Sequence, residues 1–488
     1  MSLKPVTPLT PIDPADAITP ASDFTHFFVS AAKPASRWAV GAEVELFGFT
    51  RDELARIDSG QVQAIIKGFS PQIISRVMEN GFVTEAVLGT EGLSPGVESS
   101  VITGSGFERT DLSHPAPGPA PQARASGRLT LEPGGQIEFS GEPFSALRET
   151  ERVLGDYLKR LAAIAEANGI IIIAAGFDPV RGIEEQKWIP KGRYEIMRPY
   201  LARRGRRAWD MMCRTAAIQF NFDYADLCDL AKKFTLANRL GPVAAAIFAN
   251  SPFEQGKLSG YRSTRYATWL ETDGDRAGPS PLALEDDFSI ERFITYVRSV
   301  PMFFIRRGDR HINFAGRSFD DFVTNGADPI FQDFTDHLST IFTEARLKPH
   351  VEQRSMDCCS LEMTMAALAF WKGLMYSADS LDRAIALVPK LSRDEFASLQ
   401  LEVARHGLEA RVRATTVIAL AAASIDLARA GLESIAPDEA HYLDVLEERV
   451  TRERISPADI LIRNYKGRWN GDIRKAVEYL AVAGRGDS

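Results

Sequence analysis

Four segments of the chain alternate apolar and polar residues with a period of two, the pattern of a β-strand with one buried face. The clearest runs from Leu129 to Gly141. Its Pro133-Gly134-Gly135 interruption cannot sit in a regular ladder, so it predicts a bulge or a tight bend. The polar face of this segment carries Thr130, Glu132, Gln136 and Glu138, opposite leucine, isoleucine and phenylalanine.

Three further segments, residues 40–47, 216–224 and 346–354, have the same two-sided character. If all four strands belong to one antiparallel sheet, that sheet has an apolar back and a polar front lined by carboxylates, amides and arginines. The polar positions of these three segments are Glu43, Glu45, Gln219, Asn221, Asp223, Arg346, Lys348, His350, Glu352 and Arg354.

A polar face that is simply solvated is the plainer explanation for any one of these strands. Taken together, however, like charges side by side on a sheet are destabilising unless something neutralises them. Hard oxygen ligands suit Mg²⁺ or Mn²⁺, and magnesium usually takes further ligands from substrate phosphates, which points toward a nucleotide. The candidate metal ligands are Glu43, Glu45, Glu132, Glu138 and Glu352.

The remaining patterns predict mainly helices and loops. Spacings of three and four residues predict helices over residues 52–80 and 144–168, and residues 170–177 predict a fully apolar strand. Residues 89–127 are rich in glycine, serine and proline and predict a long loop or hairpin with a flexible tip. Beyond Leu361 the pattern is nearly continuous helix.

These patterns divide the chain into three parts. Residues 1–22, with prolines at positions 5, 8, 11, 14 and 20, predict a loosely ordered arm. Residues 23–376 would form the main core, with the 89–127 loop as an insertion. Residues 377–488 would form a helical C-terminal region.

Arginine is concentrated in residues 188–212, which include Arg198. A solvated face and an electropositive wall for an anionic ligand both explain such a run. Residues 260–269 mix arginine with aromatic residues, a combination suited to gripping a carboxylate.

Composition limits the classes of function. The chain has 488 residues, 45% of them hydrophobic, which is the ordinary balance of a globular protein. Its net charge of −8 argues against a general nucleic-acid binder. The four cysteines do not make a disulfide framework, so a reducing cytoplasm is expected. The first residues lack the apolar core of a secretory signal, and the apolar runs are too short to span a bilayer, so no membrane association is expected.

A series of short motifs makes the sequence resemble the plant-type glutamate–cysteine ligase family, which includes many proteobacterial enzymes. The resemblance runs from about Trp38 to about Tyr376, and the Glu-Pro-Gly-Gly-Gln-x-Glu run is its most specific part. The motifs are Gly41-Ala-Glu-Val-Glu45, Leu131-Glu-Pro-Gly-Gly-Gln-Ile-Glu138, Gly176-Phe-Asp-Pro179, Met197-Arg-Pro-Tyr200, Asp210-Met-Met-Cys-Arg-Thr215, Gln219-Phe-Asn-Phe-Asp223, Ala249-Asn-Ser-Pro252, Tyr261-Arg-Ser263, Thr272-Asp-Gly-Asp-Arg276 and Val300-Pro-Met-Phe303.

The resemblance implies an α+β fold, in which a curved antiparallel sheet forms a cradle flanked by helices, as in glutamine synthetase and the guanidino kinases. It implies that glutamate, cysteine and ATP are converted to γ-glutamylcysteine, the first step of glutathione-type thiol biosynthesis. By matching, the five glutamates named above would bind Mg²⁺ or Mn²⁺. Gln219, Asn221 and Arg198 would contact substrate, Arg262 would hold the α-carboxylate of glutamate, and Arg354 would approach the transferring phosphate.

Several departures from the family pattern concern the acceptor side. Val44-Glu45-Leu46 stands where many members have His-Glu-Lys, and Gln353-Arg354-Ser355-Met356-Asp357 replaces Met-Arg-Gly-Ala-Asp. Two alternatives therefore stay open: a γ-glutamyl ligase that uses a different amine, and a nucleotide-binding homologue that no longer turns over. The protein is expected to act on small molecules as a monomer or homodimer.

Overall fold

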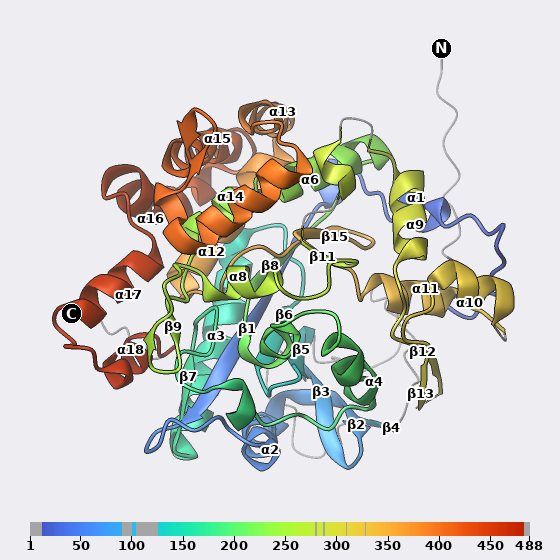
Figure 1. Ribbon diagram of the computed structural model, residues 1–488, viewed down its shortest axis with the longest axis horizontal. Helices are drawn as coiled ribbons and strands as arrows, with labels where there is room; N and C mark the ends of the chain where they lie inside the picture. Colours follow the sequence, from blue (N-terminus) through green and yellow to red (C-terminus); the bar gives the residue numbers. More distant parts are fainter. Residues whose placement is uncertain are drawn as a thin grey trace, which may run out of the picture.

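The computed structural model describes residues 12–89, 100–103, 125–278, 281–285, 288–308, 310–326 and 328–482. Within these residues, ten strands form one sheet in the order β15-β16-β8-β1-β6-β5-β3-β2-β4, with β7 paired to β1 (Figure 1). All of its pairings are antiparallel except β2 with β4. The predicted α+β architecture, a mainly antiparallel sheet flanked by helices, is confirmed.

The strands of this sheet are β1 (Val40–Thr50), β2 (Ile73–Glu79), β3 (Phe82–Gly89), β4 (Ser100–Thr103), β5 (Ala125–Leu131), β6 (Ile137–Gly141), β7 (Ile170–Ile173), β8 (Ile218–Phe222), β15 (Ala345–Leu347) and β16 (Val351–Gln353). Short two-stranded pairs are formed by β9 (Phe253–Glu254) with β10 (Lys257–Leu258), β11 (Ala277–Gly278) with β14 (Phe342–Thr343), β12 (Phe304–Arg307) with β13 (Arg310–Asn313), and β17 (Arg411–Val412) with β18 (Thr415–Thr416).

The helices up to the end of the predicted core are α1 (Thr25–Ser30), α2 (Ser59–Gly68), α3 (Leu147–Ala167), α4 (Gly192–Leu201), α5 (Ala208–Arg214), α6 (Leu227–Arg239), α7 (Gly241–Ile247), α8 (Thr264–Trp269), α9 (Ile290–Ser299), α10 (Phe319–Asn325), α11 (Phe331–Leu338) and α12 (Leu361–Tyr376). The C-terminal helices are α13 (Ala378–Leu387), α14 (Arg393–His406), α15 (Val417–Ile435), α16 (Asp444–Leu446), α17 (Pro457–Lys466) and α18 (Ile473–Tyr479). No helix of the described residues is long and apolar enough to cross a membrane.

The apolar back of the sheet is covered by helices. Strand β1 buries Val40, Val44 and Leu46 completely, and α3 packs beneath the neighbouring strands, where Phe139 of β6 stacks on Tyr157 with ring centroids 4.1 Å apart. Burial of such side chains is the main stabilising contribution of this layer. The alternation read from the sequence therefore does separate a buried face from a polar one.

Three sequence-based predictions need correction. Residues 52–80 are not one helix, because α2 ends at Gly68 and Pro71 follows, after which Ile73–Glu79 forms β2. Residues 129–141 and 346–354 are not continuous strands. Each is an antiparallel hairpin, β5–β6 and β15–β16, and of the two alternatives predicted for Pro133-Gly134-Gly135 the tight bend is the one found. In a hairpin, residues that lie opposite each other on the two strands point to the same face of the sheet. The polar residues on both sides of each turn therefore still lie together.

The ends of the predicted domains also differ from expectation. Within the arm, residues 1–11 lie outside the described residues, but Ala17 forms a bridge with Ile330 and Ile18 is buried. Most of the predicted loop 89–127 likewise lies outside the described residues, apart from β4 and the start of β5. The nearly continuous helix predicted beyond Leu361 is interrupted between α14 and α15 by the β17–β18 pair.

The C-terminal helices share one hydrophobic core with the sheet rather than forming a separate one. The closest approach is between α12 and α15, where a Cβ added to Gly431 would lie 2.0 Å from the carbonyl oxygen of Gly373. Only a residue without a side chain allows two helix backbones to come this near. The packing of α15 therefore depends on a glycine.

The substitution Gly431→Ala tests this crossing. The added methyl group overlaps backbone that cannot move away, so the free energy of unfolding should fall by about 1–3 kcal/mol. Thermal unfolding followed by circular dichroism measures the effect. Gly274→Ala is the matched control, because nothing lies within 4 Å of a Cβ at this position, and its melting temperature should match that of the wild type. Equal stability of the two variants would contradict the close packing of α12 on α15.

Candidate active site

The register of the central strands brings the predicted glutamates together. In the pairing of β1 with β6, Glu45 lies opposite Glu138 and Glu43 lies opposite Ser140. In the pairing of β1 with β8, Glu43 lies opposite Gln219. Because side chains directly across from each other in a sheet point to the same face, these carboxyl groups share the polar front.

Neutral donors hold these carboxylates in place. The Asn221 Nδ2 donates to Glu43 Oε1 at 2.8 Å, and the Gln219 Nε2 donates to Glu45 Oε1 at 2.9 Å. The hydroxyl of Thr130 donates to Glu138 Oε2 at 2.7 Å. These hydrogen bonds orient the acids without supplying a compensating positive charge.

The pKa values of these neighbouring acids are raised. Burial, followed by the charge of Glu352, raises the pKa of Glu43 to about 7. Burial also raises the pKa of Glu45 well above its ordinary value, and the charges of Glu132 and Glu138 act in the same direction. The pKa of Glu138 is raised by burial and by Glu132. Such a cluster binds protons or a cation more readily than exposed carboxylates do.

The turn between β5 and β6 fixes the spacing of Glu132 and Glu138. Gly135 has a φ of +77°, and a Cβ on Gly134 would lie 2.4 Å from the Cys213 carbonyl oxygen. Arg56 donates through Nη2 to the Gly134 carbonyl at 2.8 Å. Glycine is thus required at both positions, one for its backbone conformation and one for its close contact with α5. The Pro-Gly-Gly run therefore forms the turn that sets the spacing of Glu132 and Glu138.

Glu352 has a different environment from the other four glutamates. Arg346 forms a two-pronged ion pair with it, through a short contact from Nε and a 2.9 Å contact from Nη2. Lys348 Nζ lies 3.1 Å away and Arg354 Nη1 lies 3.4 Å away. Although burial opposes ionisation, these three cations hold the pKa of Glu352 well below its ordinary value. Its charge is already balanced by the protein.

Arg354 is joined to the carboxylate cluster. It donates from Nη1 to Gln219 Oε1, and Gln219 in turn donates to Glu45. Arg265 of α8, which the sequence did not single out, donates to the carbonyl oxygens of Arg354 at 2.8 Å and Ser355 at 3.2 Å. The Tyr261-Arg-Ser263 motif ends two residues before Arg265 and does not include it. Arg265 therefore holds the end of β16 in position.

Two predicted substrate contacts lie elsewhere. Arg262 forms ion pairs with Asp459 at 2.5 Å and with Glu409 at 3.7 Å, both from the C-terminal region. Arg198 is exposed, and its guanidinium stacks over the rings of Trp188 and Trp209 at 4.3 and 4.8 Å. The structure brings neither arginine into contact with the glutamate cluster.

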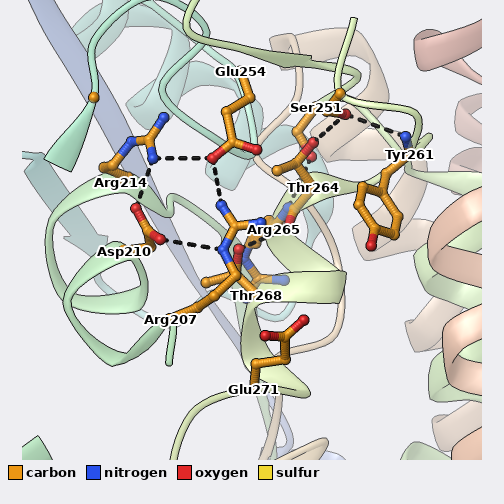
Figure 2. Close-up of polar contacts among 12 residues, drawn as sticks. Arg207, Asp210, Arg214, Ser251, Glu254, Tyr261, Thr264, Arg265, Thr268 and Glu271 are labelled. Atoms are coloured by element: carbon orange, nitrogen blue, oxygen red, sulfur yellow. Dashed lines mark hydrogen bonds and ion pairs between the residues drawn. The ribbon is translucent and has the colours of Figure 1, made fainter. Parts of the chain in front are cut away.

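Arg207 of the arginine-rich segment and Arg214 just beyond it form internal ion pairs. Arg214 contacts Asp210 at 2.6 Å and Glu254 at 3.1 Å, and Arg207 contacts the same two acids, as Figure 2 shows. Both guanidinium groups also lie over the ring of Phe177. This network links α5 to the β9–β10 pair that precedes α8.

The glutamate cluster suits a hard cation by its chemistry. Among the described residues, no three histidine, cysteine, aspartate or glutamate side chains are already grouped as a metal site. Glu43, Glu45 and Glu138 are nevertheless half-buried carboxyl groups whose hydrogen-bond partners are neutral amides and hydroxyls. Carboxylate oxygens are the ligands that Mg²⁺ and Mn²⁺ prefer, so the donor set fits such an ion.

Comparisons with known proteins define the class and then the family. Similarity to named ligases extends over 94% of the chain, which makes the protein an enzyme of the ligase class. The chain belongs to glutamate–cysteine ligase family 2, whose family model matches residues 39–479.

Individual relatives give the same result. The chain is 32% identical over 465 residues to the chloroplastic glutamate–cysteine ligase of Nicotiana tabacum, covering 94% of this chain and 82% of the relative. It is 33% identical to glutamate–cysteine ligase B, chloroplastic, of Oryza sativa subsp. japonica, covering 94% and 86%. A crystal structure of glutamate–cysteine ligase from Francisella tularensis in complex with AMP shares the fold, with 12% identity, 92% and 88% coverage and a TM-score of 0.52.

These relatives contradict the expectation of a cytoplasmic protein, because those at 32–33% identity are chloroplastic enzymes. The prediction rested on four cysteines without a disulfide pattern. That criterion indicates a reducing environment and does not distinguish one reducing compartment from another. The cytoplasmic assignment is therefore wrong on this evidence.

The raised pKa of Glu43 makes stability depend on pH. The folded protein keeps a proton on this group up to about pH 7, whereas the unfolded chain loses it near 4.5, so stability should fall as pH rises through this window. Mg²⁺ should raise the melting temperature more at pH 8 than at pH 5.5, since protons compete with the metal for the same oxygens. Calorimetry at the two pH values measures both effects. A Mg²⁺ shift that is independent of pH would contradict metal binding at these carboxylates.

Proposed function

We propose that this ligase uses ATP to join the γ-carboxylate of glutamate to the amine of cysteine on the polar front of the β6–β1–β8 sheet, giving γ-glutamylcysteine. Membership of glutamate–cysteine ligase family 2 supports the reaction. The observation that carries the site is the set of buried glutamates at the centre of the sheet, whose partners are neutral. Acidic groups held in this way suit a reaction in which anionic substrates meet a divalent metal.

The reaction needs activation because a carboxylate does not react with an amine at neutral pH. The γ-phosphoryl group of ATP is transferred to the γ-carboxylate oxygen of glutamate, and ADP leaves. The amine of cysteine then attacks the acyl carbon, phosphate leaves, and the nitrogen loses a proton. Phosphoryl transfer of this kind depends mainly on positioning and charge neutralisation, so no protein nucleophile is required.

We assign Glu43, Glu45, Glu132 and Glu138 as the residues that would hold Mg²⁺ or Mn²⁺. When bound, the ion supplies positive charge that offsets the phosphates of ATP. The chain keeps these oxygens in place through Asn221, Gln219 and Thr130. Gln219 and Asn221 are thus assigned to orienting the carboxylates, and contact with the substrate stays a prediction for both.

Arg354 is assigned to the transferring phosphate. Its guanidinium donates to Gln219, which places it beside Glu45, and Glu352 fixes it from the other side. We assign Glu352 to holding Arg346, Lys348 and Arg354 rather than to the metal, because three cations already balance its charge. Arg265 acts as a positioning residue through the backbone of Arg354.

The variants Glu45→Gln and Glu138→Gln test the site. Each keeps the shape of the side chain but removes a metal-binding oxygen and its charge, so turnover should fall by roughly a hundredfold or more while the fold is retained. Release of ADP with glutamate, cysteine, ATP and Mg²⁺ measures the rate, and circular dichroism checks the fold. Glu166→Gln, on the exposed surface of α3, is the matched control and should keep wild-type activity. Near-normal turnover in either site variant would remove the metal assignment.

The identity of the amine is tested with the wild-type enzyme. ADP release should require glutamate and cysteine together, and mass spectrometry should find γ-glutamylcysteine as the product. Faster release with another amine would show a different γ-glutamyl ligase. Tight ATP binding without turnover for any amine would show an inactive homologue and would overturn the proposal.

A further inference from the structure

Cations approach the acidic centre of the sheet from two sides. On one side stand Arg346, Lys348 and Arg354, which share the carboxylate of Glu352. On the other side Lys191 and Arg193 stand at the start of α4, where Lys191 contacts Leu131 at the end of β5. Strands β16, β8, β1, β6 and β5 are consecutive in the sheet, and Arg354 reaches inward from the β16 side to donate to Gln219 of β8.

Lys191 is a buried cation with spare donors. Only 7% of it is exposed, and its Nζ donates to the Leu131 carbonyl oxygen at 2.8 Å. An ammonium group has three N–H bonds, and among the described residues this one has a single acceptor. Burial, followed by the charge of Arg193, lowers its pKa to about 8, while Glu132, Glu79 and Glu138 oppose that change. The side chain is therefore still mostly charged at neutral pH.

Arg193 adds a second cation two residues further on. Its Nη2 donates to the Tyr194 hydroxyl at 3.0 Å, while its Nε is buried and has no hydrogen-bond partner among the residues that the structure describes. Across the described part of the chain, Arg193 has no acidic oxygen within ion-pair distance. The nearby Glu79 instead accepts from the backbone N–H of Gly192 at 3.3 Å. The N-terminal end of α4 adds a partial positive charge at the same place.

The other arginines of the same segment differ in this respect. Within residues 188–212, three of them have acidic partners, while Arg198 and Arg203 are exposed and Arg198 stacks on two tryptophans. The paired ones are Arg204 with Asp273 and Asp275, Arg206 with Glu271, and Arg207 with Asp210 and Glu254. Neither Lys191 nor Arg193 has an ion-pair partner among the described residues, and Glu79 and Glu132 act on their charges only from beyond ion-pair distance. A buried cation is stabilised when an anion pairs with it directly. Lys191 and Arg193 together thus offer a place for a ligand with several negative charges.

We propose that Lys191 and Arg193 bind the phosphate chain of the nucleotide, on the side of the glutamate cluster away from Arg354. The inference rests on the proposed function, in which ATP is a substrate. Phosphate oxygens accept hydrogen bonds from both lysine and arginine. Glu132 and Glu138 repel a free anion such as glutamate, whereas a nucleotide brings a divalent cation with it. A nucleotide phosphate therefore fits this position better than a carboxylate substrate does.

The experiment measures nucleotide binding, independently of turnover. Isothermal titration calorimetry with ADP and Mg²⁺ compares the wild type with Lys191→Met. Loss of a charged hydrogen bond should weaken ADP binding roughly 10- to 100-fold and AMP binding much less, since AMP lacks the outer phosphate. Lys191→Arg, which keeps the charge, should recover most of the affinity. Lys187→Met, on the exposed part of the same segment, should bind ADP like the wild type.

The outcomes separate this inference from the proposed function. A wild type that makes no γ-glutamylcysteine would overturn the proposed reaction, while ADP binding would still report on Lys191. Unchanged ADP affinity in Lys191→Met would overturn the phosphate assignment and leave the reaction standing. A raised KM for glutamate with unchanged ADP affinity would overturn it too. Should Lys191→Met fail to fold, Arg193→Met is titrated in its place, with the same expected loss and the same overturning result.

Discussion

The pairing of β1 with β6 places Glu45 directly opposite Glu138, and much of the structure serves to keep these two buried acids in one place. Two carboxyl groups across a strand pair are destabilising by themselves. They persist because the hydrophobic face on the other side of the same strands is fully buried, so the register cannot slip without exposing it. Burial of the apolar face therefore stabilises a strand pairing whose acidic face would be destabilising by itself.

The supports around the acids divide into two kinds. Near the centre they are neutral, namely the amides of β8 and the hydroxyl of Thr130, which fix direction while leaving the charge uncompensated. At the β15–β16 hairpin they are cations, which cancel the charge of Glu352. Five glutamates that are alike in sequence thus have two environments in the structure: one is paired with arginine and lysine, and the other four are those that we propose bind a cation.

Alternation of residues was enough to predict which side chains share the polar front, and the Pro-Gly-Gly interruption correctly marked the position of the bend. It was not enough to distinguish a bulged strand from a hairpin, because both return Glu132 and Glu138 to the same face. The environment of Arg262 could not be predicted, since its partner Asp459 lies 197 residues away in the chain. Lys191 was missed for a similar reason: nothing local shows that it folds onto the end of β5.

The C-terminal helices have a bearing on the site although none of the predicted residues lies in them. Arg262 precedes α8 and is tied to Asp459 of α17, while the backbone N–H of Arg262 donates to Ala404 of α14 at 2.8 Å. Three residues later Arg265 holds the backbone of Arg354. A chain of contacts therefore runs from the helical region through α8 to the arginine beside Glu45. Since α15 in turn packs on α12 beneath the sheet, residues 377–482 support the sheet from two directions and share its core rather than forming an appendage.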